Sequence, residues 1–155
     1  MRRLMLVLLL VGCAPVKEDI EAACTDLVRD YAYHRDRLDA AEVANLFTED
    51  AKMSVLGQEF DGRGAIERRM LDGKGGPVTR HLMSTIRIFP ESADRATGVS
   101  YVTVYISPRR DGDGPLPVEG FGGIGEYHDV FERTSDGWKI AARTFVPVFA
   151  YEDQD

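Results

Sequence analysis

The apolar positions in the first part of the chain follow the period of a helix. From residue 18 to about residue 36 they recur every three or four positions, at Ile20, Cys24, Leu27 and Tyr31. Leu38 continues the same apolar pattern just beyond. This spacing predicts an amphipathic helix with one buried face. Asp39 followed by Glu42 matches a capping box and predicts a second, short helix. The apolar side of that helix is formed by Val43, Leu46 and Phe47.

The pattern then changes to strands. A first strand is predicted at 51–56, pairing with residues 59–60 after a turn at Gly57, and a third helix at 65–71. Four longer segments are rich in β-branched and aromatic residues and are separated by turn signals, at 79–89, 96–107, 124–133 and 138–149. Helices followed by antiparallel strands predict an α+β fold whose sheet buries one face against the first helix.

The first thirteen residues have the pattern of a secretory signal. Arg2 and Arg3 precede an uninterrupted apolar run over residues 4–11. This run is far shorter than the roughly 20 residues of a membrane-spanning helix. It ends at Cys13 in a sequence that resembles the bacterial lipobox, so residues 1–12 are predicted to be removed and Cys13 to be lipidated. The alternatives are a plain secretory signal or a wrongly assigned start.

This interpretation divides the chain into four parts. They are a lipoprotein signal peptide (1–12), a tether (13–17), one folded domain (18–150) and an acidic tail (151–155). The predicted location is the bacterial cell envelope, lipid-anchored on the periplasmic side, or the secreted fraction. With Cys13 lipidated, Cys24 has no disulfide partner and is predicted to be a small buried thiol.

The charge balance argues against a nucleic-acid partner. The chain has 26 acidic and 19 basic side chains, a formal net charge of −7, and its arginines are scattered. Such a surface repels a phosphate backbone and an anionic lipid surface alike. Contact with a membrane is therefore expected only through a lipid anchor.

Several separated motifs occur in an order shared with a known family. They are Tyr33-His34, the segment from Ala41 to Asp50-Ala51, Gly62-Arg63-Gly64 with Ile66, Thr79-Arg80-His81-Leu82, and Gly125-Glu126-Tyr127-His128-Asp129 leading to Asp136-Gly137-Trp138-Lys139. In these motifs the chain resembles the SnoaL-like branch of the nuclear-transport-factor-two-like superfamily, which includes polyketide cyclases, scytalone dehydratase and steroid isomerase. The resemblance implies a cone-shaped half-barrel with N-terminal helices packed on a curved, mostly antiparallel sheet around a pocket. It also implies a small-molecule ligand, no cofactor and a homodimer, while the reaction depends on the site.

His81 is the first candidate for chemistry. Strand alternation puts His81, Met83 and Thr85 on one face of their strand. The resemblance implies that the histidine at this point faces the pocket and serves as an acid/base, a role that suits a side chain with an ordinary pKa near neutral. The alternative is a core histidine held by a structural hydrogen bond.

Tyr33 and His34 are the second candidates. They occupy the place where dehydratase-like relatives carry a tyrosine followed by an aspartate. Helical spacing from Tyr31 points His34 inward, where it could meet His81 and act as proton donor or base. Equally, His34 could be a helix-end histidine stabilised by the helix dipole.

The segment around Asp129 supplies a possible carboxylate. Tyr127, Asp129 and Phe131 share one face of their strand. The resemblance implies that the tyrosine and the aspartate face the pocket, where desolvation raises the pKa of a carboxyl toward that of a useful base. The alternative is an ion pair with Arg80 or Arg143 at the rim of the cone.

Ligand contacts are predicted from neighbouring strand positions. The candidates are Tyr127, Tyr105, Tyr101, Met83 and Phe131. Tyr101 and Tyr105 lie on the strand where dehydratase-like relatives carry a second pocket histidine, and this strand has none.

Two glycine-rich stretches, 73–76 and 120–125, lack the strand-to-helix context or the Ser/Thr that a nucleotide-binding loop needs. The three histidines show no metal-ligand spacing, so no metal or cofactor is predicted. Residues 109–123 are predicted to form a long loop near the pocket mouth, either a lid or a mobile segment.

Two functions remain open. One is an enzyme that performs cofactor-free acid/base chemistry, such as dehydration, isomerisation or cyclisation, on a small, largely apolar ligand. In that case His81 is the main catalytic residue, and His34, Asp129 and Tyr33 assist it. The other is a non-catalytic domain that holds a ligand or a partner protein in the cell envelope.

Overall fold

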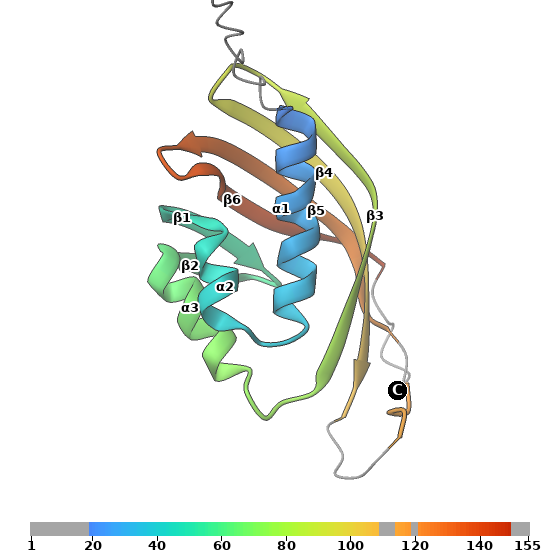
Figure 1. The fold of residues 1–155 in the computed structure, drawn as a ribbon. Helices are drawn as coiled ribbons and strands as arrows, with labels where there is room; N and C mark the ends of the chain where they lie inside the picture. The colour runs from blue at the N-terminus through green and yellow to red at the C-terminus, as the bar shows by residue number, and fades with distance from the viewer. Residues whose placement is uncertain (1–18, 109–113, 119–120, 150–155) are drawn as a thin grey trace, which may run out of the picture.

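The computed structural model describes residues 19–108, 114–118 and 121–149 (Figure 1). The elements are α1 (Ile20–Arg35), α2 (Ala40–Asn45), β1 (Phe47–Val55), β2 (Gln58–Asp61), α3 (Arg63–Asp72), β3 (Val78–Pro90), β4 (Arg95–Ser107), β5 (Phe121–Thr134) and β6 (Gly137–Phe149). The predicted signal peptide, tether and acidic tail, and much of the predicted loop at 109–123, lie outside the described residues. Within the described part of the chain, no helix has the length and apolar character needed to cross a membrane.

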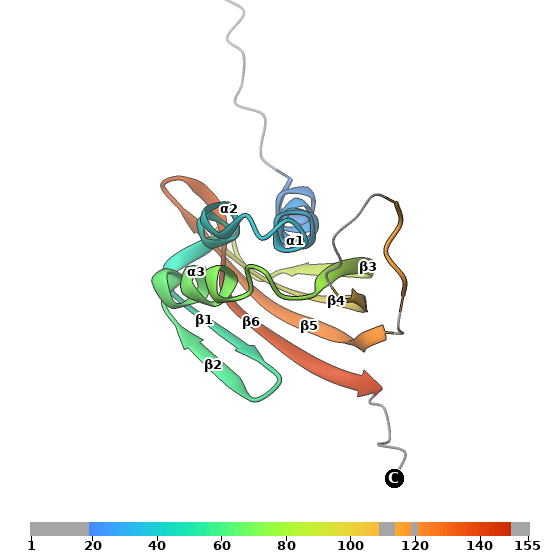
Figure 2. The ribbon, with the colours of Figure 1, turned by 90° about the horizontal axis from the view of Figure 1, so that it is seen from below.

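The six strands form one curved sheet in the order β2-β1-β6-β5-β4-β3. Neighbouring strands are antiparallel except β1 and β6, which run parallel. All three helices lie on one side of this sheet, with α1 crossing it (Figures 1 and 2). The α+β prediction of helices packed on a curved, mostly antiparallel sheet is therefore confirmed.

The start of β1 differs from the prediction, because the strand begins at Phe47 instead of residue 51. The N–H of Ile140 donates to the carbonyl of Leu46 at 2.8 Å, which joins this segment to β6 and ends α2 early. Asp39 makes no capping hydrogen bond with its side chain, so the predicted capping box is wrong. Its carboxylate instead lies 3.5 Å from Nδ1 of His34.

Helix α1 supplies one wall of the core. Its first turn is capped by Asp19, whose carboxylate accepts hydrogen bonds from the N–H groups of Glu21 and Ala22. The buried face of the helix carries Cys24, Val28, Tyr31 and Ala32. This face packs against apolar side chains of the sheet, among them Phe47, Val102, Tyr127, Phe131 and Ile140. Cys24 is fully buried there, as the helical pattern predicts.

A bulge in β3 changes which residues face the core. The pairing with β4 shifts between Ser84 and Arg87, and Thr85 has a φ of 46°. His81 and Met83 face inward before the bulge, whereas Ile86 and Ile88 do so after it. Thr85 is exposed, so its predicted place on the face of His81 is wrong, since one extra residue reverses the alternation.

A buried ion pair lies in the middle of the sheet. Asp129 of β5 and Arg143 of β6 are directly opposed, and two hydrogen bonds of 2.7 Å join Nε and Nη2 of Arg143 to the two carboxylate oxygens. Both side chains are buried, with an exposed fraction of 0% for Arg143 and 1% for Asp129. Burial alone lowers the pKa of Arg143, but Asp129 outweighs this effect and raises it above its ordinary value. The sequence allows an ion pair of Asp129 with Arg80 or Arg143 at the rim of the cone as an alternative. The structure contains this pair with Arg143, and it lies in the core instead of at the rim.

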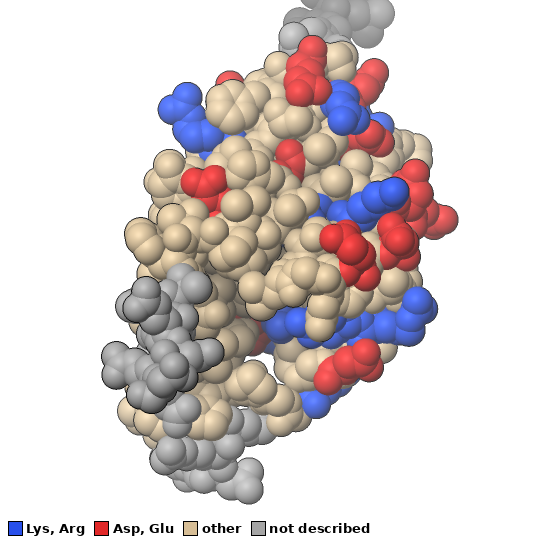
Figure 3. Space-filling model, turned by 180° about the vertical axis from the view of Figure 1, so that it is seen from behind, with Lys and Arg blue, Asp and Glu red and all other residues tan. Residues whose placement is uncertain are grey.

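The outer face of the sheet, away from the helices, carries exposed apolar side chains. Leu82, Tyr101 and Val146 are 51%, 47% and 39% exposed. In Figure 3 charged side chains gather along one side of this face, and a broad uncharged area lies beside them.

Replacing Asp129 with Asn should strongly destabilise the fold. The substitution keeps the shape of the side chain but leaves the Arg143 guanidinium buried without its counter-charge. Loss of one partner of a buried pair costs about 3–5 kcal/mol of unfolding free energy. Urea denaturation followed by circular dichroism measures this change.

Glu132→Gln is the matched control, because it removes one carboxylate charge from the half-exposed pair with Arg95. Exposed pairs contribute about 1 kcal/mol or less. Equal losses in the two variants would contradict a structural role for the buried pair.

Candidate functional site

A cavity of about 370 Å³ lies at the end of the sheet where α1 and α3 finish. This volume falls within the roughly 300–1,000 Å³ of typical small-molecule sites. Much of its wall is apolar, formed by Met53, Val55, Met70, Val104, Ile106 and Phe145. Gly122 also lines it, and a Cβ there would overlap the Ile106 side chain, so glycine at this position leaves room for Ile106 over β5. The polar lining includes Tyr31, Thr79, His81 and Tyr127.

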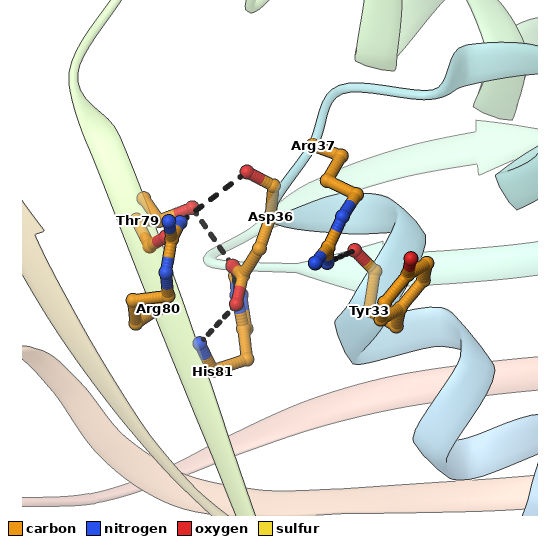
Figure 4. A network of polar contacts seen from close by, with 6 residues as sticks. All are labelled: Tyr33, Asp36, Arg37, Thr79, Arg80 and His81. Carbon is orange, nitrogen blue, oxygen red and sulfur yellow. Dashed lines mark hydrogen bonds and ion pairs between the residues drawn. The ribbon is translucent and has the colours of Figure 1, made fainter.

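The shortest polar contact at this cavity joins His81 to Asp36. Nδ1 of His81 lies 2.6 Å from Oδ1 of Asp36, and the two side chains are only 7% and 8% exposed. Asp36 is the C-terminal cap of α1, and His81 lies near the start of β3 (Figure 4). The contact therefore connects the end of the helix that crosses the sheet to an edge strand.

Two further hydrogen bonds hold the Asp36 carboxylate in place. The backbone N–H of His81 donates to Oδ2 at 2.8 Å, and the Thr79 hydroxyl donates to Oδ1 at 3.1 Å (Figure 4). Because β3 is the last strand of the sheet, an N–H group on its open edge has no strand partner and can bond to the helix end instead.

These contacts set the charge of Asp36. Burial raises the pKa of its carboxyl, but the hydrogen bonds and charge of His81, together with the Thr79 hydroxyl, outweigh burial and hold the pKa below its ordinary value. A carboxylate at this place accepts a hydrogen bond from Nδ1 of His81. The other ring nitrogen, Nε2, then carries the lone pair that can accept a proton.

An aromatic cluster adjoins the histidine. The ring of Tyr31 meets those of His81 and Tyr127 edge-on, with centroids 6.5 and 5.7 Å apart. The Arg143 guanidinium carbon lies 4.1 Å from the centre of the Tyr31 ring and 4.5 Å from that of Tyr127. The buried pair with Asp129 thus supports the two tyrosines from behind.

Tyr127 remains a neutral phenol in this cluster. Burial, followed by the neighbouring Tyr31, raises its pKa well above the ordinary value, although the positive charge of Arg143 acts in the opposite direction. The Tyr127 hydroxyl is consequently a hydrogen-bond donor at the cavity wall.

The sequence matches the SnoaL-like domain family over residues 18–144, which is most of the chain. The chain belongs to the SnoaL-like domain family. A comparison with curated proteins found no match.

Solved structures of other proteins share the fold of this SnoaL-like domain. A candidate scytalone dehydratase from Novosphingobium aromaticivorans is 26% identical, with a TM-score of 0.68 and coverage of 83% of each chain. ActVI-ORFA from Streptomyces coelicolor is 22% identical, with a TM-score of 0.67, covering 82% of this chain and 96% of that one. A candidate dehydratase of the NTF2-like family from Streptomyces avermitilis is 18% identical, with a TM-score of 0.69, covering 83% and 96%. The last two likenesses show the fold alone.

Some of the residues predicted for the site meet at or near the cavity. His81 and Tyr127 line it, while Met83 packs against the core and Phe131 is fully buried. Asp129 lies behind the tyrosines, where Arg143 bonds both of its carboxylate oxygens.

Tyr33 and His34 do not reach the cavity. Tyr33 is 53% exposed, and the guanidinium carbon of Arg37 lies 3.5 Å from the centre of its ring. The His34 ring contacts Tyr33 and Asp39. Tyr31 lies on the face of α1 that reaches the cavity. Because each helical residue adds about 100°, Tyr33, two residues later, lies on the opposite side of the helix. The predicted meeting of His34 with His81 is therefore wrong.

Tyr101 and Tyr105 lie on the wrong face of β4 for the cavity. Val104 and Ile106 line the cavity, so strand alternation directs the odd-numbered side chains to the outer face of the sheet. Tyr101 is 47% exposed there. Strand parity alone does not show which face is inside, and the prediction chose the wrong one.

Sequence reasoning missed Asp36 as the partner of His81. The available signal is its position, because a polar residue directly after the last turn of an amphipathic helix lies at a helix end that packs on the sheet. Tyr31 was assigned only to the core. Two charged residues of the wall, Arg35 and Arg69, were not singled out at all.

No group of three His, Cys, Asp or Glu side chains suited to a metal ion occurs among the residues that the structure describes.

The Asp36 carboxyl should titrate below its ordinary pKa, and His81→Phe should raise that pKa by removing the ring nitrogen while keeping a ring. Because the folded-state pKa is depressed, the contact stabilises the fold above the ordinary aspartate pKa of about 3.9, and the stabilisation is lost as pH falls through the lower, folded-state pKa. Carbon-detected NMR titration of the carboxyl measures the shift.

His34→Gln is the control, since the His34 ring contacts Asp39 and not Asp36. An Asp36 carboxyl that titrates at its ordinary value, or that responds equally to both substitutions, would rule out the coupling.

Proposed function

We propose that this SnoaL-like domain is an enzyme that performs cofactor-free proton transfer on a small, largely apolar ligand. Dehydration, isomerisation and cyclisation all need a group that removes one proton and returns one nearby. The observation that carries the proposal is the 2.6 Å contact between His81 and a buried carboxylate at the wall of a 370 Å³ cavity.

In this proposal His81 is the acid/base. Asp36 accepts the Nδ1 hydrogen, orients the ring and stabilises the imidazolium that forms when Nε2 takes a proton from the ligand. The same proton then passes to a leaving hydroxyl in a dehydration, or to another carbon in an isomerisation. In this proposal Asp36 assists His81, in place of His34, Asp129 and Tyr33, which the sequence predicts as the assisting residues.

Tyr127 and Tyr31 supply the second half of the proposed chemistry. Removal of a proton next to a carbonyl group leaves negative charge on the carbonyl oxygen, and a hydroxyl donor stabilises that charge. Both tyrosines line the cavity, and burial keeps Tyr127 in its donor form. A hydrogen bond with Tyr31 also contributes to the raised pKa of Tyr127, so the two hydroxyls act as a pair that presents a hydrogen to the oxygen while His81 takes the proton.

Similarity to known proteins supports the same class of reaction. The candidate scytalone dehydratase from Novosphingobium aromaticivorans covers 83% of this chain at 26% identity. The rival function is ligand binding without catalysis, and the experiment below separates the two.

The test uses 2-tetralone, a small bicyclic ketone whose protons next to the carbonyl exchange with D₂O when a base removes them. The wild-type domain should accelerate this exchange, and His81→Phe should reduce the acceleration by about 100-fold or more, the usual contribution of general acid/base catalysis. Asp36→Asn should also reduce it, because the imidazolium loses its counter-charge. Proton NMR in D₂O measures the rate.

His34→Gln is the matched control and should leave the exchange rate unchanged, since His34 does not line the cavity. If 2-tetralone binds at the cavity but its exchange is not accelerated, or if His81→Phe exchanges as fast as the wild type, the domain is a binding protein.

A homodimer through the outer face of the sheet also remains a prediction, which the exposed apolar side chains of that face support. Leu82→Glu should convert a dimer to a monomer in analytical ultracentrifugation. Leu71→Glu, at a 42% exposed leucine of α3 on the other side of the sheet, should not. A wild-type monomer would contradict the dimer.

Lipidation of Cys13 and a place in the cell envelope stay predictions too.

A further inference from the structure

Two arginines in the cavity wall have no polar partner in the part of the chain that the structure describes. Arg35 is the last residue of α1, one helical turn after Tyr31, and Arg69 lies near the end of α3. Within residues 19–108, 114–118 and 121–149, neither guanidinium takes part in a hydrogen bond or an ion pair, and Arg69 only approaches the ring of Phe60, at 5.7 Å. The donors of both residues are therefore available to a ligand.

Their surroundings distinguish these arginines from the others. Arg68 and Arg87 are exposed, so water can satisfy their guanidinium groups. Arg35 and Arg69 are half-buried beside apolar side chains of the cavity. Partial loss of hydration without a counter-charge is unfavourable, and an anionic ligand would relieve it.

Among the described residues that line the cavity, arginine side chains outnumber carboxylates. Besides the two arginines, the described part of the wall carries one carboxylate, Asp72, and the Asp36 carboxylate lies behind His81 and is hydrogen-bonded to its ring. The chain as a whole has a net charge of −7, so this local excess runs against the overall composition. Two guanidinium groups without a carboxylate partner among the described residues suit an anionic ligand, and the planar guanidinium fork matches a carboxylate.

We propose that the cavity takes a substrate whose apolar skeleton carries a carboxylate, held by Arg35 and Arg69. The apolar wall encloses the skeleton, and the part that reacts lies at His81. This inference rests on the proposed function for the reaction, and it adds the chemical class of the substrate.

The test compares two probes of the same size and shape, 1-naphthylacetate and its neutral amide, 1-naphthylacetamide. Each is titrated into the wild-type domain while the methyl signals of Met53 and Met70, both in the cavity wall, report binding by NMR. The carboxylate should bind about tenfold more tightly than the amide, as expected for charge-assisted hydrogen bonds. In Arg35→Gln and Arg69→Gln this preference should fall toward onefold, with little change in the affinity for the amide.

Arg29→Gln and Arg68→Gln are the matched controls. They lie on the same two helices and remove the same charge, but both side chains are exposed and outside the cavity wall. Both controls should keep the preference for the carboxylate. An equal loss in the controls, equal binding of the two probes, or binding of neither probe overturns the inference.

The outcome is separable from that of the proposed function. Loss of the carboxylate preference together with His81-dependent exchange of 2-tetralone would overturn the inference and leave the acid/base function standing. An arginine-dependent preference without any exchange would support the anion site and reject catalysis.

Discussion

The Asp36 carboxylate joins the end of α1 to the open edge of the sheet, and the cavity depends on that connection. Helix α1 crosses the sheet and would otherwise end above an edge strand that has no further strand to pair with. Hydrogen bonds from the His81 and Thr79 groups fix the helix end on β3. The space between the ends of α1, α3 and the strands is thereby held open, with the acid/base candidate in its wall. One side chain thus supports both the shape of the site and its chemistry.

Two buried carboxylates in this domain have partners of different kinds. Asp129 is bonded through both oxygens to Arg143, a side chain that keeps its charge at every pH of interest, so this pair can stabilise the fold but cannot transfer a proton. Asp36 is paired with a histidine, a side chain that can both give and take a proton. The pair with arginine suits a fixed support beneath Tyr31 and Tyr127, and the pair with histidine suits a working site. Their partners, more than their burial, separate the two roles.

The sequence predicted the fold closely because apolar periodicity is set by local geometry. Helical spacing and strand alternation depend on the backbone period, so the element order and the α+β class followed directly. The site was predicted only in part. The contact between Asp36 and His81 spans 45 residues, and no spacing rule links a helix cap to an edge strand. The bulge at Thr85 could not be predicted, because alternation assumes a regular strand. The inward face of β4 could not be predicted either, because alternation gives two faces without saying which one the helices cover.

The overall negative charge and the proposed anion site are compatible because they act over different distances. At physiological salt, charges separated by more than about 8 Å of solvent are largely screened from each other. The acidic surface therefore repels an anion only weakly at the mouth of the cavity. Inside, Arg35 and Arg69 act at contact distance next to apolar side chains, where screening is weaker and each charge-assisted hydrogen bond is stronger. An anion that enters consequently meets its largest interaction in the wall that also holds His81.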